Sequence, residues 1–413
     1  MIFLYFLIFA MPFYRHPVID SGSGAFTLVK CVGMAGLFYT MLYIPARGVP
    51  NYIQTKQAKL FFVMFAIAMF SFLRKGKGPN VEVGDPFMLW CGVVVFFILV
   101  VSLVDSPTKI RRCLLVSIAS ICFASLYPLR EFSIYSFSLP NFRPEGKIVG
   151  DSNYFALAAM LGLPIAYSWF ISERRPIYKW ALFACLVVIS AGTASVGSRG
   201  GLLALMAFVI FIIFHTRHRV RNFIVLTAIL VTPMLFIPRN PISRFIHPDY
   251  ADVKAKEVRI ETWKAGLRMI KAHPVMGIGL GEFKPQISKY TDDPKLNKLA
   301  HNTYLEIASE LGLVCFAIYI WLLYETYQTF TWLRRAAQKF NSKLMYNMAL
   351  GMQGGLVGFF VSSFFLSAEY VKFFWFYVFL SIAMVRVSQK YAAKVREPEP
   401  VLEVGGSPAL SEA

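Results

Sequence analysis

The chain has 413 residues, of which 57% are hydrophobic and only 16% are charged, and its formal net charge is +19. Apolar runs of about 17–22 residues recur along it, which is the length that crosses ~30 Å of hydrocarbon. This composition excludes a soluble multidomain enzyme and leaves no soluble domain to bind a nucleic acid, and it predicts an all-α polytopic membrane protein.

Twelve apolar segments are predicted to be transmembrane helices, with one long periplasmic loop between the ninth and the tenth. They are residues 1–13, 24–45, 58–74, 86–105, 110–127, 153–172, 178–194, 199–215, 221–237, 303–325, 346–367 and 371–386. The N-terminus lacks a basic n-region and a cleavage site, so 1–13 is interpreted as a short first span.

The predicted organisation has four parts. Spans one to nine lie within 1–237, a long outer loop with an amphipathic helix and candidate site residues covers 238–301, spans ten to twelve lie within 302–388, and a cytoplasmic disordered tail covers 389–413. The tail is predicted because its last residues are polar and rich in Pro and Gly.

Basic residues gather in the loops on one side of the predicted bundle, which places that side and both termini in the cytoplasm. The opposite loop, 238–301, nevertheless holds 12 Lys or Arg against 7 Asp or Glu. Either this loop binds an anionic ligand at the outer membrane surface, or a long loop crosses the membrane regardless of its charge.

No metal or cofactor site is predicted. The six cysteines all fall inside apolar runs without C-x-x-C spacing, so they are interpreted as small buried hydrophobes. The histidines show no H-E-x-x-H spacing and the outer loops hold no D-x-D motif.

Residues 141–164, "NFRPEGKIVGDSNYFALAAMLGLP", lead into the sixth span from outside, with Arg143 and Lys147 before the helix. The residues able to cap it are Asp151, Ser152 and Asn153. The two basic residues belong either to an ordinary loop or to a substrate site.

Residues 193–208 place Ser198 and Arg199 at the outer start of the eighth span. A charged side chain near hydrocarbon is costly and therefore marks a functional position. Together with the free N–H groups of the helix start, Arg199 predicts an anion site, and an arginine that snorkels to the interface is the alternative.

Residues 258–283 predict an amphipathic helix followed by a glycine turn. The apolar positions expected on one face are Ile260, Trp263, Leu267 and Ile270, with Trp263 at the membrane interface. The glycines of the turn are Gly277, Gly279 and Gly281. No strand precedes them, so a dinucleotide fingerprint is excluded, and a flexible turn or a backbone nest for phosphate remains.

The stretch "AHNTYLEIASELG", 300–312, sets a titratable imidazole in front of an apolar helix. Thr303 and Glu306 have the spacing of a capping box, which predicts a helix start at Thr303. The positive helix end disfavours imidazolium, so His301 is expected to be neutral, as a general base must be; an ordinary interfacial histidine is the alternative. Glu306 and Glu310 share one face, where they either support a site or compensate the helix dipole.

These segments together resemble the O-antigen ligase-like family, which contains O-antigen ligases, polysaccharide polymerases and some bacterial protein O-oligosaccharyltransferases. The resemblance rests on an S-R-G at a helix start, a long outer loop with R-x3-W and HP-x2-G-x-G-x-G-x-F, and HN-x-Y-L at the opening of a helix. It covers residues 140–320 by motif and the whole chain by its twelve-span layout.

The resemblance implies an inverting, metal-independent glycosyltransferase of the bacterial inner membrane whose active site faces the periplasm. It implies that His301 is catalytic and that Arg199 and Arg259 bind the diphosphate of an undecaprenyl diphosphate-linked glycan donor. Supporting roles are predicted for Arg143, Ser198, Trp263, Asn302, Glu306 and Glu310.

The preferred hypothesis is an O-antigen ligase that transfers the glycan to lipid A–core, and a polymerase that extends a growing glycan is the close alternative. A transporter or flippase of lipid-linked sugars is the rival from another class, and a structural scaffold is a third. Broken helices with polar groups inside the membrane would favour a transporter, and none is predicted.

Overall fold

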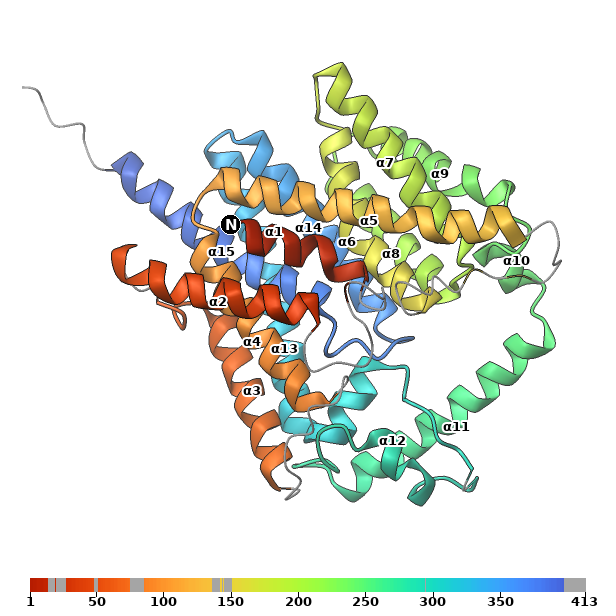
Figure 1. Ribbon diagram of the computed structural model, residues 1–413. Coiled ribbons are helices and arrows are strands. Elements are labelled where there is room, and N and C mark those ends of the chain that lie inside the picture. Colours follow the sequence, from red (N-terminus) through yellow and green to blue (C-terminus); the bar gives the residue numbers. More distant parts are fainter. Residues whose placement is uncertain are drawn as a thin grey trace, which may run out of the picture.

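The computed structural model describes residues 1–13, 19, 27–47, 51–74, 85–135, 142, 144, 151–293 and 295–396, and all regular structure in them is helical (Figure 1). The helices are α1 (Ile2–Ala10), η1 (Met11–Phe13), α2 (Leu28–Arg47), α3 (Lys56–Arg74), α4 (Pro86–Leu103), α5 (Pro107–Tyr135), α6 (Ser152–Phe170), α7 (Pro176–Ser195), α8 (Arg199–His215), α9 (Arg219–Leu235), α10 (Pro241–Ile246), α11 (Tyr250–Ala272), α12 (Phe283–Gln286), η2 (Ile287–Lys289), α13 (Thr303–Lys339), α14 (Lys343–Ser362) and α15 (Lys372–Arg396).

Each of the twelve predicted spans overlaps at least one of these helices. Among the described residues, six helices are long and apolar enough to cross a membrane: α3, α4, α5, α7, α13 and α14. Shorter apolar helices lie in Ile2–Phe13, Leu28–Leu42 and Arg199–His215. The protein is therefore an all-helical, multi-pass membrane protein, and the count of twelve spans stays a prediction. Helix α15 continues to Arg396, so the first residues of the predicted tail are helical, and 397–413 lie outside the described residues.

Helix α14 lies at the centre of the bundle and packs against α6, α8 and α13. A Cβ atom at Gly351 would meet the backbone of Ile165, and one at Gly355 would meet the carbonyl oxygen of Met160. Glycines at these positions let the helices approach at backbone distance, as small residues do in membrane proteins.

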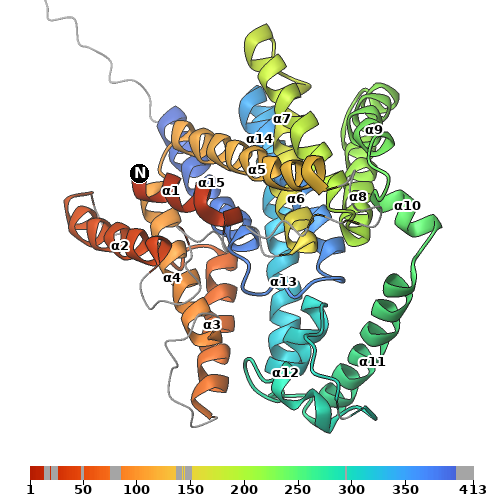
Figure 2. The same ribbon diagram turned by 45° about the vertical axis from the view of Figure 1, so that its right-hand side comes forward.

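Contacts between helices that are far apart in the sequence bring the predicted cytoplasmic helix ends together at one end of the bundle. Arg386 Nη1 donates to the carbonyl of Val101 (2.7 Å), and the Tyr346 hydroxyl donates to the carbonyl of His215 (3.4 Å). Helices α11 and α12 lie at the end remote from the N-terminus in both views (Figures 1 and 2). The segment 238–301 thus covers the opposite end from the basic loops.

Helix α13 is broken at Gly312, which corrects the prediction of one straight span over 303–325. Gly312 has φ 82° and ψ 169°, outside the helical region. The rings of Tyr304 and Tyr319 lie 6.2 Å apart, whereas residues 15 positions apart in a straight helix are separated by about 22 Å. Residues 303–311 therefore fold back beside the long part of α13.

This break also contradicts the expectation that no helix is broken. The amide of Leu313 donates to the carbonyl of Pro274 (2.8 Å), and a Cβ at Gly312 would collide with the carbonyl of Val275. Only glycine tolerates both this φ and this contact. The start of α13, residues 303–311, thus folds back on the rest of the helix and is called the re-entrant helix below; His301 lies directly before it.

The face of α11 that packs against the rest of the loop does not include Ile260 and Leu267 of the predicted apolar face. Ala265 and Met269 are fully buried, and they belong to a small core with Phe283, Ile287 and Leu296 from the rest of the loop. Ile260 is 42% exposed and Leu267 is 61% exposed. These two residues therefore lie on the outer surface, and the prediction that the apolar face meets the membrane interface stays a prediction.

Candidate active site

The starts of three helices meet at the end of the bundle that α11 covers. Ser198 Oγ, before α8, lies 2.8 Å from Asn153 Oδ1 in α6. Thr303 Oγ1, at the start of α13, donates to the carbonyl of Leu366 (2.6 Å). The segment 363–371, which joins α14 to α15, thus completes a floor between α6, α8 and α13.

Side-chain caps define where these helices begin. Asp151 accepts from the amide of Asn153 (2.6 Å) and Ser198 accepts from that of Gly201 (3.1 Å). The cap of α13 is Asn302, whose Oδ1 accepts from the amide of Leu305 (3.1 Å), so the predicted capping box of Thr303 and Glu306 is wrong although the helix does start at Thr303. The Thr303 hydroxyl is unavailable because it binds the segment 363–371.

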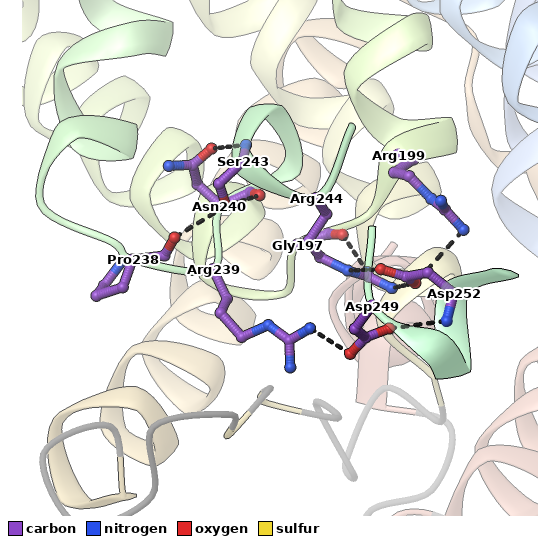
Figure 3. A network of polar contacts seen from close by, with 9 residues as sticks. All are labelled: Gly197, Arg199, Pro238, Arg239, Asn240, Ser243, Arg244, Asp249 and Asp252. Carbon is purple, nitrogen blue, oxygen red and sulfur yellow. Dashed lines mark hydrogen bonds and ion pairs between the residues drawn. The ribbon is translucent and has the colours of Figure 1, made fainter. Parts of the chain in front are cut away.

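Asp252 of α11 organises the arginines next to α8 (Figure 3). Arg244 donates two hydrogen bonds to the Asp252 carboxylate, one from Nε (3.3 Å) and one from Nη2. The same carboxylate forms an ion pair with Arg199 Nη2 at 3.4 Å. Arg244 Nη1 also donates to the carbonyl of Gly197 (2.6 Å). Asp252 therefore fixes the direction of the Arg199 guanidinium.

A second ion pair stabilises the corner between α10 and α11 (Figure 3). Arg239 Nη2 lies 2.5 Å from Asp249 Oδ2, and this contact holds the pKa of the Asp249 carboxyl below its usual range. Asp249 also caps α11 by accepting from the amide of Asp252 (2.8 Å), while Asn240 caps α10 through the amide of Ser243 (2.9 Å).

His301 lies in a strained, mostly buried position. Its φ is 47°, which non-glycine residues rarely adopt and which often marks functional sites. Trp263 of α11 donates through Nε1 to the carbonyl of Ala300 (2.9 Å), which fastens the backbone just before the histidine. His301 Nδ1 is buried and has no hydrogen-bond partner in the described part of the chain.

Burial and the nearby Arg259 lower the pKa of His301, with Lys298 adding to the effect and Asp151 opposing it. The imidazole is therefore neutral near pH 7, as expected. The physical cause differs from the expected one, because burial and a guanidinium act here rather than the end of the helix.

Arg259 lies close to both of the other predicted groups. Burial and the neighbouring Arg199 lower its pKa, and Asp151 raises it. Within the described ranges it makes no hydrogen bond or ion pair, so its guanidinium is free to bind a ligand. Arg199, Arg259 and His301 thus converge from α8, α11 and the start of α13.

The charge around His301 is positive. The cations there are Arg199, Arg244, Arg259 and Lys298, and the carboxylates are Asp151 and Asp252. Two guanidiniums with an excess of positive charge suit a ligand with several phosphate oxygens.

Neither Glu306 nor Glu310 is interfacial, since their exposed fractions are 3% and 4%. Glu310 accepts from the amides of Gly281 (2.7 Å) and Phe283 (2.9 Å), so it fastens the glycine turn to the re-entrant helix. Glu306 Oε2 is buried without a hydrogen-bond partner among the described residues.

The glycine turn is neither flexible nor a phosphate nest. Gly277, Gly279 and Gly281 have φ values of 64°, 118° and 71°. Their amides donate to His273 O, to Glu310 O and to the Glu310 carboxylate, respectively. With these donors used inside the fold, the turn serves to dock the loop on α13.

Several residues near His301 were missed, namely Asp151, Arg244, Asp252 and Lys298. Asp151 was noted only as a cap, and no sequence spacing distinguishes the others from ordinary loop charges. Arg143 lies outside the described residues. In the described ranges, no group of three or more His, Cys, Asp or Glu side chains is arranged to hold a metal ion.

Comparison with known proteins supports the predicted resemblance over the middle of the chain. Residues 184–320 match the family model described as O-antigen ligase. This match contains Arg199, Arg259 and His301. No curated protein matches the chain. Residues 184–320 of this membrane protein are therefore similar to the O-antigen ligase family, which confirms the resemblance drawn from the sequence.

Proposed function

We propose that the protein is a periplasmic-face glycosyltransferase that moves a glycan from undecaprenyl diphosphate to an acceptor hydroxyl. The observation that carries the proposal is the convergence of Arg199, Arg259 and a neutral His301 at the end of the bundle opposite the basic loops. The match of residues 184–320 to the O-antigen ligase family supports the same reaction class.

In the proposed reaction, His301 accepts the proton of the acceptor hydroxyl. Because Nδ1 is buried, Nε2 is the ring nitrogen that serves as the base. The acceptor oxygen forms a bond to the anomeric carbon while the bond from that carbon to the diphosphate oxygen breaks. The electron pair of that bond leaves with undecaprenyl diphosphate, and the configuration at carbon inverts.

Arg199 and Arg259 stabilise the negative charge that grows on the leaving diphosphate. A guanidinium binds two phosphate oxygens at once through two parallel hydrogen bonds. Because both guanidiniums are positioned before the reaction, they need little reorganisation in the transition state. Since two guanidiniums supply this charge, we propose that the reaction needs no divalent metal.

Within this reaction class, we propose ligation to lipid A–core, with polymerisation of repeat units as the alternative. Both reactions use the same donor and base, and they differ in the acceptor. The glycan profile of a deletion strain separates them. Lipid-linked polymer that accumulates without reaching lipid A indicates a ligase, whereas single repeats alone indicate a polymerase.

One observation favours the rival transporter of lipid-linked sugars. Helix α13 is broken at Gly312 and places Glu306 and Glu310 inside the bundle, and broken helices with buried polar groups are typical of transporters. A transporter would move the donor across the membrane of proteoliposomes without making a new glycosidic bond.

The test uses purified full-length protein, an undecaprenyl diphosphate-linked glycan and candidate acceptors, with product measured in excess EDTA. We expect product with the wild-type protein and a loss of about 10²–10⁴-fold with folded His301→Ala, because a general base is worth that much. Movement of the donor across the membrane without any product would support the transporter. Activity lost in EDTA and restored by Mg²⁺ would refute the metal-free reaction.

A further inference from the structure

A small cavity behind the re-entrant helix is used by no step of the proposed reaction. Its volume is about 10 Å³, enough for one water molecule. It is lined by Met64, Trp90, Leu280, Glu306, Ile307, Glu310, Leu311, Tyr319, Glu369, Tyr370 and Trp375. Three carboxyl groups thus surround a space that is otherwise apolar and aromatic.

Five polar atoms on the residues that line this cavity lack hydrogen-bond partners in the described part of the chain. They are Trp90 Nε1, Glu306 Oε2, Tyr319 Oη, Glu369 Oε2 and Tyr370 Oη. Trp90 and Tyr319 are 1% and 0% exposed, so bulk water does not reach them. Buried polar groups are almost always satisfied, so this concentration of unpaired atoms points to a bound molecule.

The unpaired atoms suit water. The indole N–H of Trp90 can only donate, and it needs an acceptor. Carboxyl oxygens of Glu306 and Glu369 need donors, and one water molecule supplies both functions at once. Glu310 does not need a hydrogen bond from this water, because the amides of Gly281 and Phe283 already donate to its two carboxylate oxygens.

The charge of the cavity requires a proton as well. Among the described residues, no lysine, arginine or histidine lines it. The titratable groups on its lining residues are Glu306 and Glu310 from the start of α13, Tyr319 from the long part of α13, and Glu369 and Tyr370 from segment 363–371. Asp85, before α4, interacts electrostatically with Tyr370. Adjacent carboxylates in a water-poor site cannot all ionise. Burial and the charge of Glu310 raise the pKa of Glu369 to about 8.

We propose that this cavity binds one water molecule and one proton shared by Glu306 and Glu369, and that this unit fastens the helix behind His301 to segment 363–371. The two elements are already joined next to the cavity. The Thr303 amide donates to Ser363 O (2.9 Å) and Leu366 O (3.0 Å), and the Ala368 amide donates to Thr303 Oγ1 (2.9 Å). Glu306 and Glu369 lie one turn or less beyond these bonds, so they are positioning residues for His301.

The sign of the pH dependence follows from the shared proton. At neutral pH the pair holds its proton and the helix stays docked. Glu369 ionises as the pH rises through about 8, and loss of the proton shared by the pair at higher pH leaves two carboxylates that repel each other in the cavity, so the position of His301 loosens. Transfer activity should therefore fall on the alkaline side, while the neutral state of His301 persists there.

Infrared titration of the full-length protein in nanodiscs tests the proton directly. The wild-type protein should show the carbonyl band of a protonated carboxylic acid near pH 7, and this band should weaken as the pH rises through about 8. Glu306→Gln and Glu369→Gln combined in one protein should remove it. Glu257→Gln, at an exposed position of α11, should leave it unchanged. A wild-type protein without this band overturns the inference.

The activity readout rests on the proposed function, whereas the infrared readout does not. In the transfer assay, Glu369→Gln should keep wild-type activity at pH 7 within about threefold and lose the alkaline decline, because glutamine stays neutral. An alkaline decline identical to that of the wild type would overturn the positioning role. A protein that shows the band but no transfer refutes the proposed function alone.

Discussion

Asp252 is the buried carboxylate on which the orientation of Arg199 depends, and Asp252→Asn tests that dependence. The side chain of Asp252 is 4% exposed and that of its partner Arg244 is 12% exposed. Removing one member of a buried ion pair costs about 3–5 kcal/mol, because the other charge stays buried without its counterion. Asparagine keeps one acceptor oxygen, so we expect a loss near ~3 kcal/mol in the free energy of unfolding.

Asp249→Asn is the matched control, since Asp249 lies three residues away at the same helix start. Its side chain is 42% exposed, and such surface pairs contribute about 0–1 kcal/mol. Asparagine also caps helices as well as aspartate does, so the cap on the Asp252 amide survives. The comparison therefore isolates the buried pair from the exposed pair with Arg239.

The assay measures the free energy of unfolding by chemical denaturation in detergent and the KM for the lipid-linked donor. Asp252→Asn should lower stability and raise the donor KM by about tenfold or more, since about 1.4 kcal/mol of lost orientation is tenfold in binding. Asp249→Asn should change stability by less than about 1 kcal/mol and KM by less than about threefold. Equal effects of the two substitutions would refute the argument that Asp252 orients Arg199.

Three further predictions follow from single side chains. Arg199→Lys should raise the donor KM by about tenfold, because an ammonium cannot form the two-pronged contact with phosphate. Arg259→Gln should raise the pKa of His301 by removing a nearby cation, so the acidic limb of the pH–rate profile should move to higher pH. Gly312→Ala should destabilise the fold by at least about 1–3 kcal/mol, because φ is 82° and the new Cβ would meet Val275 O.

Each of these has a result that would contradict it. Unchanged donor KM in Arg199→Lys would argue against a phosphate contact. An acidic limb of the pH–rate profile that lies at the same pH in Arg259→Gln would show that Arg259 does not affect the pKa of His301. For the glycine, Gly33→Ala in α2 is the control, because nothing lies within 4 Å of the added atom. Equal thermal midpoints for the two alanine variants would contradict a required turn at Gly312.

The helical segments could be predicted because their signals are local. Apolar runs long enough to cross hydrocarbon identify the helices, and Arg199 and His301 each stand at the start of an apolar helix, whereas Arg259 was singled out only by the family resemblance. The break in α13 could not be predicted, because apolar residues follow Gly312 and one glycine is tolerated in a helix. Only its contact with Val275, 37 residues earlier in the chain, makes the turn.

The contact between α11 and the rest of the loop could not be predicted for a related reason. Ile260 and Leu267 satisfy helical periodicity, but periodicity does not tell which apolar environment a helix face meets. The structure buries Ala265 and Met269 against the loop, while Ile260 and Leu267 are exposed. Glu369 was missed because the segment 363–371 was assigned partly to a span, and its nearness to Glu306 depends on the fold-back of α13.

The most direct test of the central claim is a structure of the full-length protein in nanodiscs with undecaprenyl diphosphate. We predict that phosphate oxygens lie within hydrogen-bond distance of both Arg199 and Arg259, and that His301 Nε2 faces the bond between the lipid diphosphate and the glycan. A diphosphate bound elsewhere, or one that contacts neither guanidinium, would contradict the account.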